Sequence, residues 1–117
     1  MTPEQIRKYV EEYPDLLGKK EKLQKRLISL SGRDPDQEIV FMMRLQTIEQ
    51  AIELIDSAAY EEKMVDSREA CILVHRIEGR SIQEIADYFS LTHQGVRKII
   101  GSAYKKMAES FNKEKIA

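Results

Sequence analysis

Tryptophan is absent from the sequence, and cysteine, proline and glycine are scarce. The chain has one cysteine, three prolines and five glycines among its 117 residues. A lone cysteine, Cys71, cannot close a disulfide within the chain, and it is compatible with a reducing compartment. Because residues that break helices are few and Lys, Glu, Leu and Ile are many, the predicted fold class is all-α.

The sequence also lacks a long apolar run. No stretch approaches the roughly 20 apolar residues that a membrane-spanning helix needs. The first residues do not form a basic segment followed by an apolar one, so no signal peptide is predicted. We therefore expect a soluble protein of the cytoplasm with no membrane partner.

Residues that carry out catalysis or bind metals are not grouped along the chain. Cys71, His75 and His93 do not have metal-ligand spacing. No glycine-rich phosphate loop is present, and the carboxylates are scattered over helix surfaces. We expect no enzymatic activity, no catalytic residue, no metal and no cofactor. His75 is interpreted as an ordinary residue of a packed helix, and Cys71 as an inert residue of the core.

Charge is distributed unevenly between the two halves of the chain. Residues 1–66 contain 10 Lys or Arg and 14 Asp or Glu, whereas residues 67–117 contain 9 and 6. An acidic first half and a basic second half indicate two different tasks. We accordingly divide the chain into an N-terminal unit, 1–62, and a basic C-terminal domain, 63–117.

The first half has the pattern of an antiparallel helical hairpin. A capping box at Thr2 and Gln5 begins a first helix that should end near Tyr13, before Pro14. Two helices with heptad spacing follow, joined by a short turn at 32–36. Their recurring positions are Leu16, Lys20, Leu23, Leu27 and Leu30 in one helix and Phe41, Leu45, Ile48, Ile52, Ile55 and Ala59 in the other. Such helices should pack side by side in the manner of a coiled coil.

This hairpin has more than one possible role. A structural stalk or a dimerisation surface is the simpler interpretation, and a ligand groove lined by Phe41, Met42 and Met43 is the alternative. Further apolar residues lie beside the heptad positions, namely Ile39, Val40 and Leu54. They indicate that the second hairpin helix contacts either the C-terminal domain or a second copy of the chain.

Residues 81–110 have the pattern of a helix-turn-helix. Ser81 can cap a helix over 82–88. Thr92 can cap a final helix over 92–108. Apolar side chains recur on one face of each, namely Ile82, Ile85, Ala86 and Phe89 in the first and Val96, Ile100, Ala103 and Met107 in the second. Two short helices joined by a tight turn are typical of proteins that place the second helix in the major groove of DNA.

The outward face of the final helix is cationic. Between Thr92 and Met107 the sequence has four Lys or Arg residues and no acid. Side chains in the first turns of such a helix reach base edges, and Gln and Arg pair well with adenine and guanine. The predicted base-reading residues are His93, Gln94, Arg97 and Lys98. The predicted phosphate-binding residues, which position the protein without reading sequence, are Arg80, Ser81, Thr92, Lys105 and Lys106.

Residues 69–107 resemble the promoter-reading region 4 of bacterial sigma factors. The shared features are Glu78-Gly79, Ser81 with Glu84-Ile85-Ala86, Thr92 with Val96-Arg97, and Ala103 with Lys105-Lys106-Met107. Ser90 stands where that family usually has glycine, and nothing in the chain resembles the promoter-melting region of a complete sigma factor. A hairpin followed by this motif is similar to small phage transcription regulators of the ArpU and RinA kind.

The resemblance implies a sequence-specific, DNA-binding transcription regulator of phage or prophage origin. Its expected partners are double-stranded DNA, a second copy of the chain in a homo-oligomer, with a dimer favoured, and RNA polymerase as a further candidate. Two alternatives remain open. One is a DNA-packaging subunit similar to small terminases, and the other is a module that binds polymerase or a sigma factor without contacting DNA.

Overall fold

The computed structural model describes residues 1–116, with side chains described as far as Glu114. These residues form six helices and no strand, so the predicted all-α class is confirmed. The helices are α1 (Pro3–Glu11), α2 (Tyr13–Leu30), α3 (Pro35–Glu61), α4 (Ser67–Ile77), α5 (Ile82–Phe89) and α6 (His93–Ile116). No helix of the described residues is both long and apolar enough to cross a membrane.

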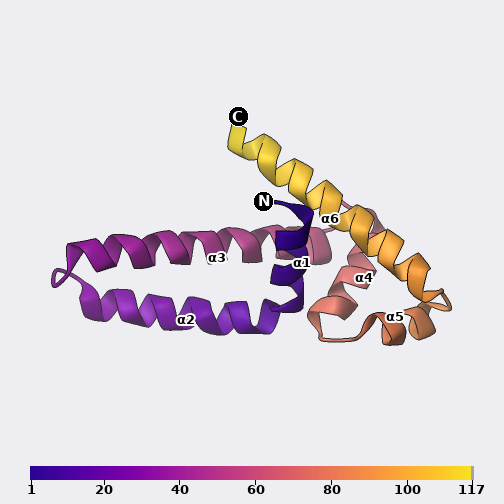
Figure 1. The fold of residues 1–117 in the computed structure, drawn as a ribbon, viewed down its shortest axis with the longest axis horizontal. Coiled ribbons are helices and arrows are strands. Elements are labelled where there is room, and N and C mark those ends of the chain that lie inside the picture. The colour runs from indigo at the N-terminus through magenta and orange to yellow at the C-terminus, as the bar shows by residue number, and fades with distance from the viewer. Residues whose placement is uncertain (117) are drawn as a thin grey trace.

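The molecule is elongated, with principal extents of 55 × 32 × 21 Å. Helices α2 and α3 run side by side in opposite directions and project from the other helices as an arm (Figure 1). Helix α1 crosses the base of this arm, and α4, α5 and α6 form the opposite end of the molecule (Figure 1). The long axis is therefore set by the arm.

Capping boxes begin three of the helices. In each, the cap side chain accepts a backbone N–H while the third helical residue reaches back to the cap; the pairs are Thr2 with Gln5, Asp66 with Glu69 and Ser81 with Glu84. Such a cap stabilises a helix by about 1 kcal/mol because it satisfies N–H groups that have no partner in the helix. These signals were readable in the sequence, and they place helix starts correctly.

The boundary between the first two helices differs from the prediction. Helix α1 ends at Glu11, and α2 begins at Tyr13, so Pro14 lies in the first turn of α2. Proline is tolerated there because the first N–H groups of a helix have no acceptor within it. Pro14 therefore belongs to the start of a helix, whereas we had expected it to follow a helix end.

The seam of the arm is buried only where the arm joins the rest of the molecule. Ile52, Ile55 and Ala59, near the end of α3, are buried. Nearer the tip the seam residues are only half-buried, namely Leu23, Leu27, Leu30, Phe41, Leu45 and Ile48. Two helices packed against each other cover one side of each helix, so a third element is needed to bury the seam completely.

Helix α1 packs with the C-terminal helices and not along the arm. It contacts α4 and α6, and its Ile6 and Val10 are almost completely buried in the same core as those helices. Arg76 of α4 forms an ion pair with Glu11 at 3.2 Å. The division at residue 62 thus marks a change in sequence pattern, while a single hydrophobic core spans both sides of it.

Two further expectations are corrected. Cys71 is exposed, so its assignment to the core is wrong; the buried face of α4 is formed instead by its neighbours Ile72 and Leu73. The final helix extends to Ile116, beyond the expected end at residue 108. Its added turns lie near the chain start, where the amino group of Met1 donates to Asn112 Oδ1 at 2.9 Å.

Candidate nucleic-acid interface

Helices α5 and α6 meet through a tight turn. Ser90 ends α5 in the left-handed backbone region, with φ of 54°, and the N–H of Leu91 donates to the carbonyl of Ala86 at 2.8 Å. Ile85 and Ala86 of α5 and Val96 of α6 are buried. The small Ala86 side chain at this crossing allows the two helices to approach closely.

The start of α6 depends on Thr92 and Gly95. Thr92 Oγ1 accepts the N–H of Gly95 at 2.9 Å, which caps the helix. A Cβ added at Gly95 would lie 3.0 Å from the same oxygen, closer than such atoms normally approach. Gly95 therefore serves the cap of its own helix. The Thr92 hydroxyl, predicted to bind phosphate, is engaged in this cap and remains at the exposed surface.

The predicted base-reading residues lie together on the first two turns of α6. Gln94, Arg97 and Lys98 are exposed, and His93 is half-buried. The opposite side of the helix carries the buried residues, namely Val96, Ile100, Ala103, Tyr104, Met107 and Ala108. Among the described side chains, none forms a hydrogen bond or ion pair with Gln94, Arg97 or Lys98. These three polar groups are thus held at the surface on an anchored helix and are available to a ligand.

Lys105 and Lys106 are adjacent in the sequence but have different surroundings. Lys105 lies three turns of helix beyond Gln94, on the same side of α6 as the base-reading residues. Lys106 Nζ donates to Glu69 Oε1 of α4 at 2.7 Å, and Glu69 is only 3% exposed. The predicted phosphate contact of Lys106 therefore competes with neutralisation of a buried carboxylate.

Arg80 and Ser81 lie at the start of α5. The guanidinium of Arg80 contacts Glu78 and the ring of His75, at 2.7 Å from Nδ1. Ser81 Oγ accepts the N–H of Glu84 at 3.1 Å. Both predicted phosphate-binding side chains thus have intramolecular partners, which a phosphate group would have to share or replace.

Two ionisable groups at the base of α4 have shifted pKa values. The N–H of Glu69 donates to Asp66 and lowers the pKa of the Asp66 carboxyl. The hydrogen bond to Glu69 raises the pKa of Lys106. Both shifts favour the charged forms, so the electrostatic link between α4 and α6 persists through the neutral pH range.

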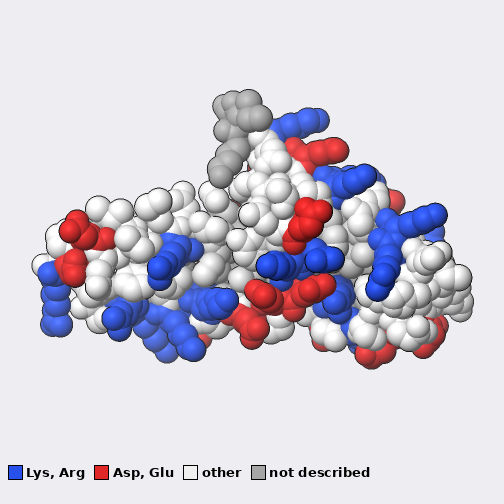
Figure 2. Space-filling view, in the orientation of Figure 1, with Lys and Arg blue, Asp and Glu red and all other residues white. Residues whose placement is uncertain are grey.

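A second group of cations was missed in the sequence analysis. Lys19, Lys22 and Arg26 of α2 and Arg44 of α3 are exposed along one side of the arm. Lys and Arg gather over the arm and over the end formed by α5 and the start of α6 on the face shown in Figure 2. The 3–4 spacing of residues 19, 22 and 26 was a readable signal, since residues so spaced share one side of a helix.

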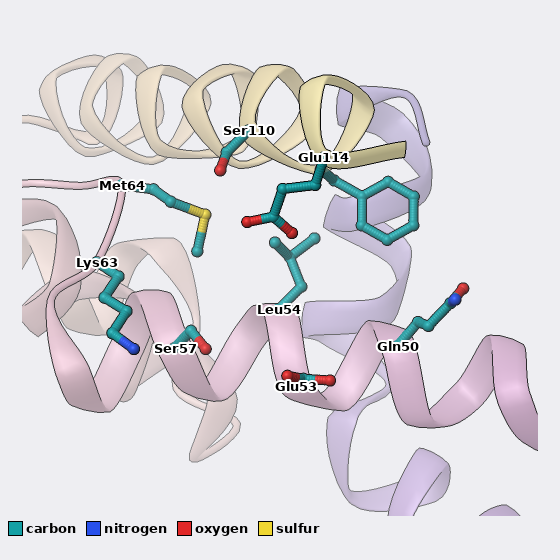
Figure 3. Close-up of a pocket in the computed structure, with 9 residues that line it drawn as sticks. Gln50, Glu53, Leu54, Ser57, Lys63, Met64, Ser110 and Glu114 are labelled. Atoms are coloured by element: carbon teal, nitrogen blue, oxygen red, sulfur yellow. The ribbon is translucent and has the colours of Figure 1, made fainter. Parts of the chain in front are cut away.

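One hollow among the described residues lies between α3 and α6. Its volume is about 460 Å³, and its lining mixes Glu53 and Glu114 with Lys63 and the apolar Leu54 and Met64 (Figure 3). Among the described residues, no group of His, Cys, Asp and Glu side chains is arranged to hold a metal ion. The exposed surface of the first turns of α6 therefore remains the strongest candidate site.

Comparison of the chain with protein-family models, curated proteins and solved structures found no match.

Proposed function

We propose that the protein is a sequence-specific DNA-binding transcription regulator whose helix α6 enters the major groove. The observation that supports this function is the exposed trio Gln94, Arg97 and Lys98, which has no intramolecular partner and lies on a helix buried along its other side. Gln and Arg are the side chains best suited to read adenine and guanine in that groove.

Phosphate contacts in this proposal come mainly from Lys105, with further contacts from Arg80, Ser81 and Thr92 at the helix starts. Lys106 contributes through its charge while it remains paired with Glu69. Each phosphate neutralised steepens the salt dependence of binding by about 0.9 in log–log slope. Since so few cations are available per chain, a single copy should bind weakly, and self-association through the arm would supply the missing affinity.

The proposal places the protein in the cytoplasm of a bacterial host, encoded by a phage or prophage, with RNA polymerase as a second candidate partner. Its support is the likeness of residues 69–107 to sigma region 4. The chain contains nothing similar to a promoter-melting segment, so the proposed regulator acts on polymerase that opens promoters by other means.

Selection of bound fragments from random DNA tests this function. We expect an enriched motif, arranged as repeated half-sites about 10 base pairs apart if a twofold dimer binds. Gln94→Ala should change the preferred sequence more than the overall affinity, because Gln94 is assigned to base reading. A selection that yields no motif would overturn sequence-specific binding.

A double variant provides a second test of this function. Arg97→Ala with Lys98→Ala should reduce affinity for the selected DNA at least tenfold, whereas Arg33→Ala with Lys63→Ala removes the same charge away from the first turns of α6 and should have a small effect. Equal losses from both pairs would indicate nonspecific attraction. If neither pair affects DNA binding, the assignment of the contacts to α6 fails. If the unaltered chain binds no DNA, a module that binds polymerase or a sigma factor without contacting DNA becomes the better interpretation.

The arm favours one other function, a DNA-packaging subunit similar to small terminases. Both sides of the arm are open to solvent, and a subunit that meets neighbours on two sides can form a ring. A native mass of eight or more copies would favour this packaging function. A stable monomer or dimer would exclude it.

A further inference from the structure

The arm of α2 and α3 is one layer thick, and its two sides differ in chemistry. Seam residues are reached from both sides, because a hollow of about 570 Å³ opens beside Leu27 and Leu45 and another of about 470 Å³ beside Leu23 and Ile48. Neither hollow is closed by another part of the described chain. Each side of the arm therefore leaves apolar seam residues accessible to solvent or to a binding partner.

One side, here called the methionine face, is apolar with acids. Its residues are Leu17 and Ile28 of α2 and Ile39, Met42, Met43, Glu49 and Glu53 of α3, together with Glu21 of α2, which forms an ion pair with Lys25. Ile28 is 78% exposed and Met43 is 63% exposed. Glu49 lines the hollow with Met42 and Met43, and Glu53 follows one helical turn later. Exposed apolar patches rimmed by charge are typical of binding surfaces.

The opposite side, here called the arginine face, has a cationic rim around an apolar floor. Its residues are Lys19, Lys22, Leu23 and Arg26 of α2 and Val40, Arg44, Thr47 and Ile48 of α3. The guanidinium groups of Arg26 and Arg44 lie 5.8 and 5.5 Å from the centre of the Phe41 ring. No described carboxylate forms an ion pair with the four cations of this face, which are Lys19, Lys22, Arg26 and Arg44.

Charge decides how two arms could pack. If two arginine faces met across a twofold axis, cations would oppose cations, and two methionine faces, which carry the unpaired acids Glu49 and Glu53, would gain no opposite charge. Like charges brought together across an interface cost several kcal/mol, whereas unlike faces attract and cover apolar surface on both partners. Figure 2 shows the cationic side of the arm, where acids gather only near the tip and the base.

We propose that the occupant of each face is a second copy of this chain, with the arginine face of one arm packed on the methionine face of the next. Lys22 and Arg44 of one copy then lie against Glu49 and Glu53 of its neighbour. This deepens the self-association of the proposed function, and it does not depend on DNA. Such a head-to-tail interface forms a ring if the rotation closes and a helical array if it does not.

The size of the arm agrees with contacts on both faces. Helix α2 has 18 residues, so the arm is about 27 Å long and about 20 Å wide. That gives a flat footprint of roughly 500 Å² per face, less than the roughly 800 Å² per partner of a standard stable interface. Each single interface is therefore small, and a closed assembly, in which every subunit has two such interfaces, would be much more stable than an isolated pair.

Two variants, each blocking one face, test the arrangement. Lys22→Glu with Arg44→Glu makes the arginine face acidic, and Ile39→Gln with Met42→Gln replaces apolar side chains of the methionine face by neutral polar ones. All four side chains are exposed in the single copy, so the fold should be retained, which circular dichroism checks. By native mass spectrometry we expect the unaltered chain to form assemblies of three or more copies and each variant alone to be monomeric.

Mixing the two variants distinguishes head-to-tail from twofold packing. Each variant retains the face that the other lacks, so the mixture should give a one-to-one heterodimer and nothing larger. If the first variant alone forms a dimer, the interface is twofold through the methionine faces. If the second alone does so, it is twofold through the arginine faces. Either result overturns the proposal, as does an unaltered chain that stays monomeric.

A charge-exchange experiment distinguishes a lost interface from a variant that fails to fold. Glu49→Lys with Glu53→Lys should abolish assembly alone and restore it when mixed with Lys22→Glu and Arg44→Glu. Absence of restoration between two folded variants would contradict the proposed pairing. Arg97→Ala with Lys98→Ala should leave the native mass unchanged while it weakens DNA binding, so failure of the assembly and failure of the DNA-binding function can be told apart.

Discussion

Glu69 connects α4 to α6, and this contact affects which lysine of α6 is available to a phosphate group. Its carboxylate accepts the N–H of Asp66 at 2.9 Å and the ammonium group of Lys106 at 2.7 Å. A buried carboxylate without a partner is strongly unfavourable. Lys106 is therefore held in its ion pair with Glu69, and Lys105 is the cation that is more available to a phosphate group.

Asp66 should make the stability of the protein sensitive to acid. Its pKa is lowered in the folded state, chiefly by the N–H of Glu69. The stabilisation is therefore present above the unfolded pKa of about 3.9 and is lost as the pH falls through the lower folded value. Asp66→Asn keeps the cap and removes the titration.

Thermal unfolding between pH 7 and pH 2 measures this contribution. We expect the Tm of the unaltered chain to fall more steeply below pH 4 than that of Asp66→Asn. Parallel Tm curves for the two proteins would show that Asp66 is not a source of the acid sensitivity.

Ser90 occupies a backbone conformation that favours glycine. Its φ of 54° lies in the left-handed region, where a side chain with a Cβ costs about 1 kcal/mol. Ser90→Gly should therefore stabilise the protein by about 0.5–1 kcal/mol, as measured by urea unfolding. Ser90→Ala should not stabilise it, because alanine retains the Cβ. Equal effects from both substitutions would contradict this account of the turn.

At the scale of the element, α6 presents one side to the core and another to solvent. Lys105 and Lys106 test this division because both are exposed, while only Lys106 is paired with the buried Glu69. Lys105→Ala should lower the log–log salt slope of DNA binding by about 0.9 and leave the Tm nearly unchanged. Lys106→Ala should lower the Tm, because Glu69 loses its partner, and should have a smaller effect on the slope.

Salt-dependent binding assays and thermal unfolding of both variants give the comparison. If Lys106→Ala lowers the salt slope as much as Lys105→Ala does, Lys106 leaves Glu69 when DNA binds. If Lys105→Ala has no effect on the slope, the phosphate contacts lie elsewhere on the surface.

Most elements of this fold could be predicted from the sequence because their signals are local. The capping boxes of Thr2 and Ser81 and the apolar stripe of α6 are patterns within a few turns of helix. The end of α1 was misjudged because Pro14 can follow a helix or begin one. Cys71 was misplaced because the apolar residues of α4 surround it in sequence, while the direction of the core depends on other helices.

At the scale of the whole molecule, α1 joins the two halves. Ile6 is 1% exposed within the core that α4 and α6 share. Ile6→Ala should destabilise the protein by about 2–4 kcal/mol, since it removes buried methylene groups and leaves a cavity. Because the core is continuous, unfolding followed by circular dichroism and by fluorescence of the tyrosines should give one shared transition.

The matched control is Ile28→Ala on the arm, where the side chain is mostly exposed and the effect on monomer stability should be small. A two-step transition, with the C-terminal helices unaffected by Ile6→Ala, would show that α1 is not part of their core.

The sequence by itself determined the helices, their caps and the polar side chains at the start of the last helix, because helical periodicity and capping depend on residues within a few positions of one another. Only the tertiary structure decided which neighbour each helix meets. It placed α1 on the C-terminal helices, paired Lys106 with Glu69, and separated the arm into two faces of opposite charge. These outcomes depend on contacts between residues far apart in the chain, which local patterns do not specify.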